Sequence, residues 1–544
     1  MAAEIRIATG GGRSGFAHPI AFWTGVLASI IGVLMHLPMY IDARDMGYHM
    51  HGMAPDSTMI TGMGLIVVGL GLSYYGVVPR ASKEISHTAR TIHVRALDDA
   101  PIRGAHIALI LAMALAVTID VMKPTTLSFV APGMAAEYGL RSPANPHAAI
   151  PISWLPLFGI TGTVVGSFIW GWLGDRIGRR ASIIMAGMLF ITTSICGTMP
   201  GFIWNLAMCL VMGISAGGML PICFALLAET IPSKHRGWLM VLIGGDIAGA
   251  YVIVSWLSGW LTPTYSWRIL WLVGLPTGIL FIALSKWIPE SPRFLLASGR
   301  AKEAEEVMAR YGAVAEAVPE QEAEVRREIE RADGFLLFRR PLIGPTTAIT
   351  ILAIGIGLMT YGFTFWVPTN LQHLGYSAVN SDFVVRNAAL IGLPLTVLTA
   401  WMYGVWGSRK TIVTVSAVTG LTLLGFVFAG DRLAHDQTLL SLLLVIPLSG
   451  VSSVVAVVLS YAAEVYPTLV RSRATGFAAG MTKAGGVLIL ALTVAAATVP
   501  SLSTTALMGS VPLLLAAFAF VWIGPETKSR RLEDITQQLL PDRP

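Results

Sequence analysis

Apolar runs of about 20 residues recur along almost the whole chain, and they constrain its fold more than any other feature. A helix needs a run of that length to cross a hydrocarbon core, and about fourteen such runs lie between Pro19 and Gly524. In lipid every backbone polar group has to be satisfied within its own segment, so the runs predict helices rather than strands. The sequence therefore predicts an all-α membrane protein.

The composition supports the same class. Hydrophobic residues make up 54% of the 544 positions and charged residues only 12%, whereas soluble domains carry roughly 25% charged residues. The net charge of +6 predicts no nucleic-acid partner, because Lys and Arg lie in short loops between predicted helices, where they set orientation. Three cysteines (Cys196, Cys209 and Cys223) lie in apolar runs without metal-type spacing, which predicts small core residues.

Basic residues gather in alternate loops, and this bias predicts that both termini are cytoplasmic. A bacterial inner membrane is the expected location, since no eukaryotic sorting signal is evident. The fold expected is a twelve-helix, two-half core preceded by two extra N-terminal transmembrane helices. In chain order the predicted parts are the N-terminal transmembrane helix pair (1–80), a basic cytoplasmic linker (81–103), the first six-helix half (104–288), a cytoplasmic loop with short amphipathic helices (289–342), the second six-helix half (343–523) and a cytoplasmic tail (524–544). A disordered linker is the alternative for 299–332.

A spacing of charged and proline residues occurs twice, once in each predicted half. Glu229, Pro232 and Arg236 form the pattern E-x2-P-x3-R, and the same pattern begins again at Glu464, 235 residues later (464 − 229). The stretch GDRIGRR (174–180) has a weaker echo in GVWGSRK (404–410). Duplicated halves around a central site are how many secondary transporters are built.

These repeated loop motifs predict a cytoplasmic gate. Glycines allow a tight turn and close helix approach, and interfacial ion pairs can hold one face closed until the halves move. A simple topogenic role for the charges is the alternative. The predicted gate residues are Asp175, Arg176, Arg179, Arg180, Glu229, Arg236, Glu464 and Arg471.

Three motifs resemble signatures of the major facilitator superfamily, within its sugar-porter and metabolite–proton symporter branches. They are GWLGDRIGRR (171–180), PESPRFLL (289–296) and GPETKSRRLEDI (524–535), and the resemblance extends over about 104–535. It implies two pseudo-symmetric six-helix halves, alternating access and often proton coupling. The sequence departs from the pattern at Val405, which replaces an expected acid, and in having its extra helix pair before the first half.

Charged side chains inside predicted spans mark a transport pathway, because they are costly at bilayer depth. Asp120 and Asp246 are the predicted proton-coupling residues, and a static pair of Asp120 with Lys123 is the alternative reading. Lys123, Lys483 and Arg386 favour an anionic substrate over a neutral one. Lys483 then needs Asp246 or a bound anion as its partner.

Aromatic and polar side chains of the second half complete the expected substrate site, namely Tyr361, Asn370 and Ser453. Trp366 is expected in an interfacial belt. Sugar porters usually carry glutamines in helices five and seven, and this chain lacks them there, which argues against a hexose.

The expected function is therefore secondary active transport of a small organic anion, coupled to protons. Export of drug-like or hydrophobic compounds is an alternative. Another is a non-transporting sensor that binds copper through the His/Met loop around 49–53, although packing is the default role for the helix pair. No enzyme motif, P-loop, cofactor or resident metal site is expected, and the sequence leaves the oligomeric state open.

Overall fold

The computed structural model describes most of the chain. The described residues are 16–79, 83–85, 88, 92–96, 101–142, 145–245, 247–284, 287–317, 336–338, 342–429, 436–466, 468–496 and 501–527. The first part of the chain contains α1 (Pro19–Leu34), α2 (Leu37–Asp42), η1 (Ala43–Met46), α3 (Ser57–Val77), β1 (Ile92–Ala96), α5 (Gly104–Glu137), α6 (Trp154–Ile177), α7 (Arg179–Thr192), η2 (Thr193–Thr198), α8 (Phe202–Ala216), α9 (Met219–Thr230), α10 (Ser233–Gly244), α11 (Ile247–Tyr265), α12 (Ile269–Leu272) and α13 (Gly274–Leu284).

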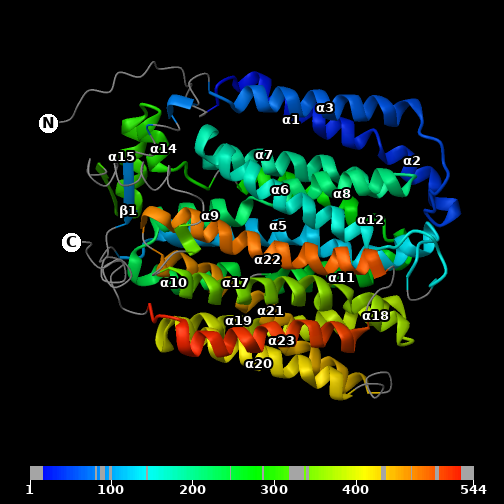
Figure 1. Cartoon of the computed structure of the whole chain (residues 1–544). Coiled ribbons are helices and arrows are strands. Elements are labelled where there is room, and N and C mark those ends of the chain that lie inside the picture. The colour runs from blue at the N-terminus through cyan, green and yellow to red at the C-terminus, as the bar shows by residue number, and fades with distance from the viewer. Residues whose placement is uncertain are drawn as a thin grey trace. The chain divides into compact units, whose positions relative to one another are not determined.

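The rest of the chain continues this helical pattern (Figure 1). It contains α14 (Pro292–Ala297), α15 (Ala301–Tyr311), β2 (Ala313–Ala317), η3 (Leu336–Phe338), α17 (Ile343–Leu358), η4 (Met359–Phe363), η5 (Thr364–Trp366), α18 (Val367–His373), α19 (Ala378–Trp406), α20 (Ser408–Ala429), α21 (Gln437–Val465), α22 (Thr468–Ala496) and α23 (Leu502–Ile523).

Several long helices begin at a side chain that caps the first turn. Asp56 accepts a hydrogen bond from the backbone of Met59 at the start of α3, and Asp436 does the same for Leu439 at the start of α21. Ser377 and Ser501 cap α19 and α23 in the same way. Such caps satisfy backbone donors that the helix itself leaves free.

The helices match a membrane environment in length and in surface chemistry. Within the described residues, 11 helical segments are long and apolar enough to cross a membrane, and three shorter apolar helices occur at 154–170, 202–216 and 269–284. Large hydrophobic side chains point outward, with Ile20 and Phe428 both 85% exposed. A water-soluble surface rarely presents such patches, so the prediction of an all-α membrane protein is confirmed.

The chain divides into two compact units that do not follow sequence order. One comprises Met1–Lys123, Val165–Arg236 and Tyr265–Ala323, and the other comprises Pro124–Val164, Gly237–Thr264 and Glu324–Pro544.

In the first unit α1 and α3 pack against each other through small residues. A Cβ added to Gly69 of α3 would lie 2.4 Å from Ser29 Oγ and 2.7 Å from the Gly25 carbonyl oxygen of α1. Both helices also contact α7, and Tyr40, Met50 and other residues around α2 join a hydrophobic cluster with Ile195. Met50 is fully buried, which agrees with a packing role for this segment.

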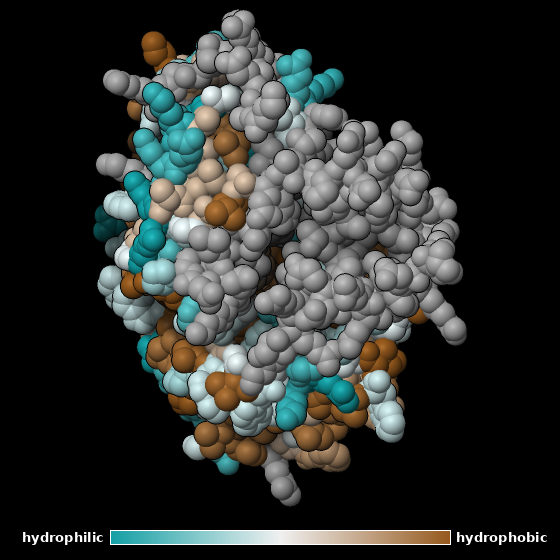
Figure 2. Space-filling model, turned by 90° about the vertical axis from the view of Figure 1, so that its left-hand side faces the viewer, coloured by the Kyte–Doolittle hydropathy of each residue, from teal (hydrophilic) through white to brown (hydrophobic). Residues whose placement is uncertain are grey.

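A two-stranded antiparallel sheet in the first unit was not predicted. It joins β1, from the basic linker, to β2, from the loop after α15, with Val94 opposite Ala315. Figure 2 looks onto the end of the molecule at which Figure 1 shows β1, α14 and α15, and hydrophilic side chains lie there beside hydrophobic ones. Helix α15 is the first of the two short helices expected in this loop, and the second lies outside the described residues.

In the second unit α17 packs against α22 and α23, while α20 and α21 pack against each other and α19 packs against α21. The end of α17 changes into the π-helical turn η4 and the 3-10 turn η5 before α18 begins. Trp366 lies in that irregular stretch and is fully buried. The expectation of an interfacial position for Trp366 is therefore wrong, because neighbouring helices cover this segment.

Candidate functional site

In the first unit a glutamate anchors the start of α7. Glu290 Oε1 accepts hydrogen bonds from the backbone nitrogens of Arg179 (2.7 Å), Arg180 (3.4 Å) and Ser291 (2.9 Å). Gly178 precedes α7 with φ +94°, a conformation that L side chains rarely adopt, and a Cβ there would lie 2.5 Å from Glu290 Oε2. The turn therefore requires glycine both for its backbone and for the approach of the carboxylate.

The Glu290 carboxylate lies at a helix start, where backbone donors and the helix dipole favour negative charge. Burial nevertheless raises the pKa of Glu290 above its ordinary value, because desolvation penalises the charged form more than its partners favour it. The opposing influences are the three backbone hydrogen bonds and the charge of Arg179. Glu290 is therefore both a hydrogen-bond acceptor for the start of α7 and a titratable group with a raised pKa.

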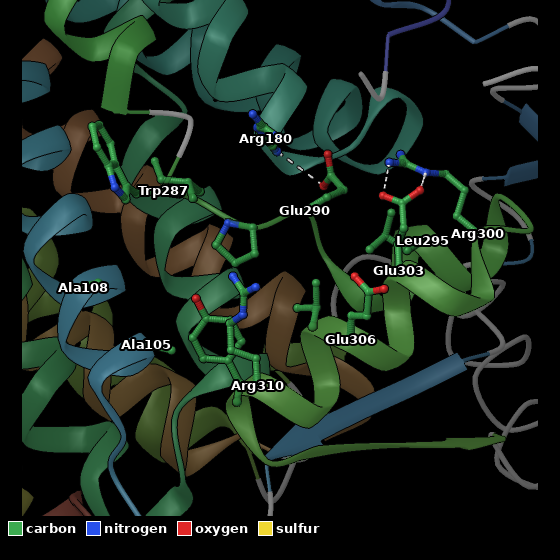
Figure 3. A pocket seen from close by; sticks show the side chains of 14 residues that line it. Ala105, Ala108, Arg180, Trp287, Glu290, Leu295, Arg300, Glu303, Glu306 and Arg310 are labelled. Atoms are coloured by element: carbon green, nitrogen blue, oxygen red, sulfur yellow. Dashed lines mark hydrogen bonds and ion pairs between the residues drawn. The ribbon is translucent and has the colours of Figure 1, made fainter. Parts of the chain in front are cut away.

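A pocket of about 300 Å³ opens beside this anchor (Figure 3). Its walls come from the start of α5, the start of α7, the segment before α14 and one face of α15. Arg300 and Glu303 form an ion pair at 2.5 Å on the α15 side, and their hydrogen bonds lower the pKa of Glu303. The lining mixes cations and carboxylates, so it does not select an anion or a cation by charge alone.

In the second unit Glu526 anchors the start of α20 in a similar way. Glu526 Oε1 accepts hydrogen bonds from the backbone nitrogen of Ser408 (2.8 Å), from Ser408 Oγ (2.9 Å) and from the backbone nitrogen of Thr527 (3.0 Å). Gly407 precedes α20 with φ +99°, and a Cβ there would lie 2.6 Å from Glu526 Oε1. Each unit thus contains one glycine turn held by one glutamate.

Glu464, predicted as a gate residue, lies beside the Glu526 anchor. The Tyr403 hydroxyl donates to Glu464 Oε2 at 2.7 Å, and Thr527 Oγ1 lies 2.7 Å from the same oxygen. Thr527 Oγ1 is also 2.7 Å from Ser408 Oγ. Hydroxyl groups therefore link the two carboxylates and connect the end of α21, the start of α20 and the segment after α23.

The remaining predicted gate residues are only partly described. Arg179 and Arg180 start α7 at the Glu290 anchor, and Arg176 lies in the last turn of α6. The side chains of four others lie outside the described residues, although their backbones are helical: Asp175, Glu229, Arg236 and Arg471. The ion-pair network expected among these residues therefore stays a prediction.

Asp120 and Lys123, the charges predicted within the first core helix, are both buried on α5. Lys123 Nζ lies 5.8 Å from the centre of the Phe190 ring and 6.0 Å from that of Trp271. Its Nζ has no hydrogen-bond partner among the described residues, so no hydrogen bond joins it to Asp120, and a static pair of the two charges stays an alternative. Asp246, the second predicted proton-coupling residue, lies outside the described residues.

Lys483 lies in the middle of α22 and faces α6. Its Nζ donates to the carbonyl oxygen of Thr163 at 3.4 Å. One turn further along α22, a Cβ at Gly486 would lie 2.2 Å from the ring of Tyr361. Residues three apart share a helix face, so the Lys483 ammonium and the Tyr361 ring lie on the same side of α22.

The other predicted substrate residues are placed apart from one another. Asn370 is buried in α18 and donates to the carbonyl oxygen of Trp366, and Ser453 of α21 accepts a hydrogen bond from Thr399 of α19 at 3.1 Å. Arg386 lies on α19, where its guanidinium donates to Asn387 Oδ1 and stacks on Phe383. Of the predicted set, only Lys483 and Tyr361 of η4 are placed at the same side of one helix, α22, by contacts among the described residues.

Sequence reasoning missed the two anchoring glutamates. A signal was present, because Pro289-Glu290-Ser291 and Pro525-Glu526-Thr527 repeat with an offset of 236 (526 − 290), close to the offsets of the other repeats. The two stretches belong to different motifs, PESPRFLL and GPETKSRRLEDI, and the repeat becomes evident only when these motifs are aligned with each other. Asp382 was missed as well, since it lies in a polar stretch near the start of α19 rather than within an apolar run.

Known proteins similar to this chain are transporters. The sequence profile of the Major Facilitator Superfamily matches residues 109–490. The niacin transporter NiaP of Acinetobacter baylyi is 25% identical over 451 residues, covering 81% of this chain and 99% of that protein. The 4-hydroxybenzoate transporter PcaK of the same species is 24% identical over 422 residues, covering 75% of this chain and 88% of that protein.

A solved structure has the same fold. The inward-open xylose transporter XylE from E. coli superposes with a TM-score of 0.60 at 17% identity, and the match covers 80% of this chain and 99% of XylE. At that identity the likeness concerns the fold alone.

Proposed function

This chain belongs to the Major Facilitator Superfamily, and on that premise we propose that it is a proton-coupled secondary transporter of a small organic anion. The observation that carries the proposal is the arrangement at α22, where the Lys483 ammonium and the Tyr361 ring of η4 lie at the same side of the helix. A carboxylate can bind the ammonium while an attached ring stacks on the tyrosine. Two of the relatives are named for niacin and 4-hydroxybenzoate, which are small aromatic acids, and this supports the same substrate class here.

The proposed coupling residues are Asp120 and Asp246. Asp120 supports the assignment because it is buried within a membrane-spanning helix and is not hydrogen-bonded to Lys123. An acid in such a place is costly when charged, so its ionisation is tied to whichever conformation admits water. Lys123, Arg386, Asn370 and Ser453 remain proposed substrate residues. The proposed membrane is the bacterial inner membrane, with both termini in the cytoplasm and α1 and α3 as additional spans.

The test is uptake by proteoliposomes under an imposed pH gradient. Labelled nicotinate and 4-hydroxybenzoate are compared with labelled xylose, in the wild type, Asp120→Asn and Lys483→Ala. We expect gradient-driven uptake of an aromatic acid, loss of the pH dependence in Asp120→Asn, and a raised KM in Lys483→Ala. Lys302→Ala, at an exposed position on α15, is the matched control for the loss of one cation.

Two results would contradict the proposal. Saturable xylose flux that is unchanged in Lys483→Ala would contradict the proposal of an anionic substrate. It would not contradict the proposal that the protein is a transporter. Extrusion of hydrophobic dyes without uptake of either acid would favour an exporter instead.

A further inference from the structure

A buried carboxyl group joins α11 to α19 in the second unit. Asp382 Oδ2 accepts a hydrogen bond from Ser258 Oγ at 2.5 Å, and the two residues are 5% and 1% exposed. Next to them a Cβ at Gly259 would lie 2.4 Å from the ring of Phe383. The two helices are therefore closely packed at this point, with the Asp382–Ser258 hydrogen bond inside the contact.

No ion pair involves Asp382 among the described residues. Arg386 lies one turn further along α19, but its guanidinium donates to Asn387 Oδ1 at 2.7 Å and lies 4.5 Å from the centre of the Phe383 ring. The nearest cation in the sequence is thus held by other partners. The only described hydrogen-bond partner of Asp382 is a neutral hydroxyl.

Among the described residues, the charges on the other elements around α19 have other partners or lie at its far end. On α21, Asp436 caps the helix start by accepting a hydrogen bond from Leu439. Arg409 and Lys410 start α20, beyond the opposite end of α19, which is about 36 Å from Asp382 at 1.5 Å per residue. Glu464 ends α21 at that same far end, beside the Glu526 anchor. Neighbouring segments also carry phenols, among them Tyr251 on α11 and Tyr376 before α19. The side chain of His373 on α18, and Asp431, Arg432 and His435 before α21, lie outside the described residues.

A charge that is buried without a cation costs several kcal/mol unless it is neutralised or reaches water. For Asp382, either a proton in the packed state or hydration after separation of α11 from α19 would remove that cost. We propose that Asp382 is a proton-binding residue of the transport cycle, protonated while Ser258 holds α11 against α19 and ionised once these helices separate. The proposal rests on the proposed function, in which proton movement is coupled to opening and closing.

The proton has a defined place in the packed state. It occupies Oδ1 of Asp382, so Oδ2 still accepts the Ser258 hydrogen bond. When the helices separate, the proton leaves to the water that enters, and the carboxylate becomes hydrated. Ser258 retains a partner in that state, since its Oγ lies 3.4 Å from Thr262 Oγ1 on the same helix.

Infrared spectroscopy of the full-length protein in nanodiscs tests proton binding without any substrate. The wild type, Asp382→Asn and the control Asp436→Asn are titrated with pH while the carboxylic acid C=O stretching band is recorded. We expect a band that Asp382→Asn lacks and Asp436→Asn keeps. Identical bands in Asp382→Asn and wild type at every pH would overturn the proposal.

Ser258→Ala provides a second readout if Asp382→Asn fails to fold. It keeps the carboxyl group but removes the hydroxyl donor, so the same band is expected to shift. A band that stays in place would show that it does not arise from the Asp382–Ser258 contact, and this would also overturn the proposal.

Transport measurements then place the residue in the cycle. With nicotinate as the probe, Asp382→Asn is expected to lose accumulation driven by a pH gradient while it keeps counterflow exchange, and Asp382→Glu is expected to restore accumulation in part. Wild-type accumulation in Asp382→Asn would overturn the coupling role. If the wild type transports neither aromatic acid, the proposed function fails, whereas the infrared titration still decides whether Asp382 binds a proton.

Discussion

Glu290 Oε1 lies 2.7 Å from the backbone nitrogen of Arg179 and so holds the first turn of α7 through its main chain. The arginine thus contributes its peptide group as well as its guanidinium charge. A motif that looks like a cluster of charges therefore also positions a helix start. The same arrangement recurs at Glu526 and Ser408, where no arginine supplies the peptide group.

Removing either anchor is expected to destabilise its unit. Glu290→Ala leaves the buried backbone donors of α7 without their carboxylate, at a cost of about 1–3 kcal/mol. Thermal unfolding in detergent, followed by tryptophan fluorescence, measures the loss. Glu303→Ala is the control, because Glu303 is exposed and its ion pair with Arg300 is worth little. Equal stability of the two variants would contradict the anchoring role.

Alanine is expected to be poorly tolerated at Gly178 and Gly407. Both glycines have φ near +95°, and in both cases a Cβ would press on the anchoring carboxylate. A strained conformation of this kind costs about 1–3 kcal/mol, and the contact with the carboxylate adds to it.

Gly64→Ala and Gly476→Ala are matched controls for these two variants. Both positions are helical, and a Cβ there meets no atom within 4 Å, so alanine is expected to be neutral or slightly stabilising. The unfolding temperatures of all four variants test this, and we expect a decrease only in Gly178→Ala and Gly407→Ala. A stable and active Gly178→Ala would mean that the turn does not need glycine.

The pH dependence of stability is expected to change in Glu290→Gln. The pKa of Glu290 is raised in the folded state, so folding binds a proton and stability falls as pH rises from the unfolded pKa through the folded one. Glutamine has no proton to lose, so that contribution disappears. Unfolding temperatures of both proteins between about pH 4 and 7 should diverge, with the wild type losing more as pH rises. Parallel curves would contradict this prediction.

The sequence predicts helices well here because length and apolarity alone decide what can span a membrane. It predicts contacts less well. Trp366 looked interfacial because tryptophans usually are, yet the irregular turns after α17 bury it. The pairing of β1 with β2 joins segments more than 200 residues apart. The five residues of β1 (IHVRA) alternate between apolar and polar, but those of β2 (AVAEA) do not, so the sequence does not indicate the pairing.

In the candidate site, too, the sequence predicts some residues well and misses those whose role depends on contacts. Lys483 and Asp120 were found because a charge within an apolar run is conspicuous. Glu290 and Glu526 were not, since each lies near a helix end, where acids are common for reasons of capping. Asp382 was not, since it lies in a polar stretch near the start of α19. Their roles become clear only from their hydrogen-bond partners. For the two glutamates the partner is the backbone of a helix start, and for Asp382 it is a serine of another helix.

The association of α1 with α3 is expected to depend on Gly69. In a membrane, helices associate through close packing rather than by hydrophobic burial, and Gly69 lets Ser29 and the Gly25 backbone approach. Gly69→Leu should separate the pair locally and lower stability by about 1–3 kcal/mol. Gly71→Leu is the control on the same helix, because a Cβ at Gly71 meets nothing within 4 Å. Tryptophan fluorescence, which includes Trp23 on α1, and limited proteolysis between α1 and α3 report the change. Equal behaviour of the two leucine variants would mean that α1 and α3 are held by other contacts, of which those with α7 are the first to test.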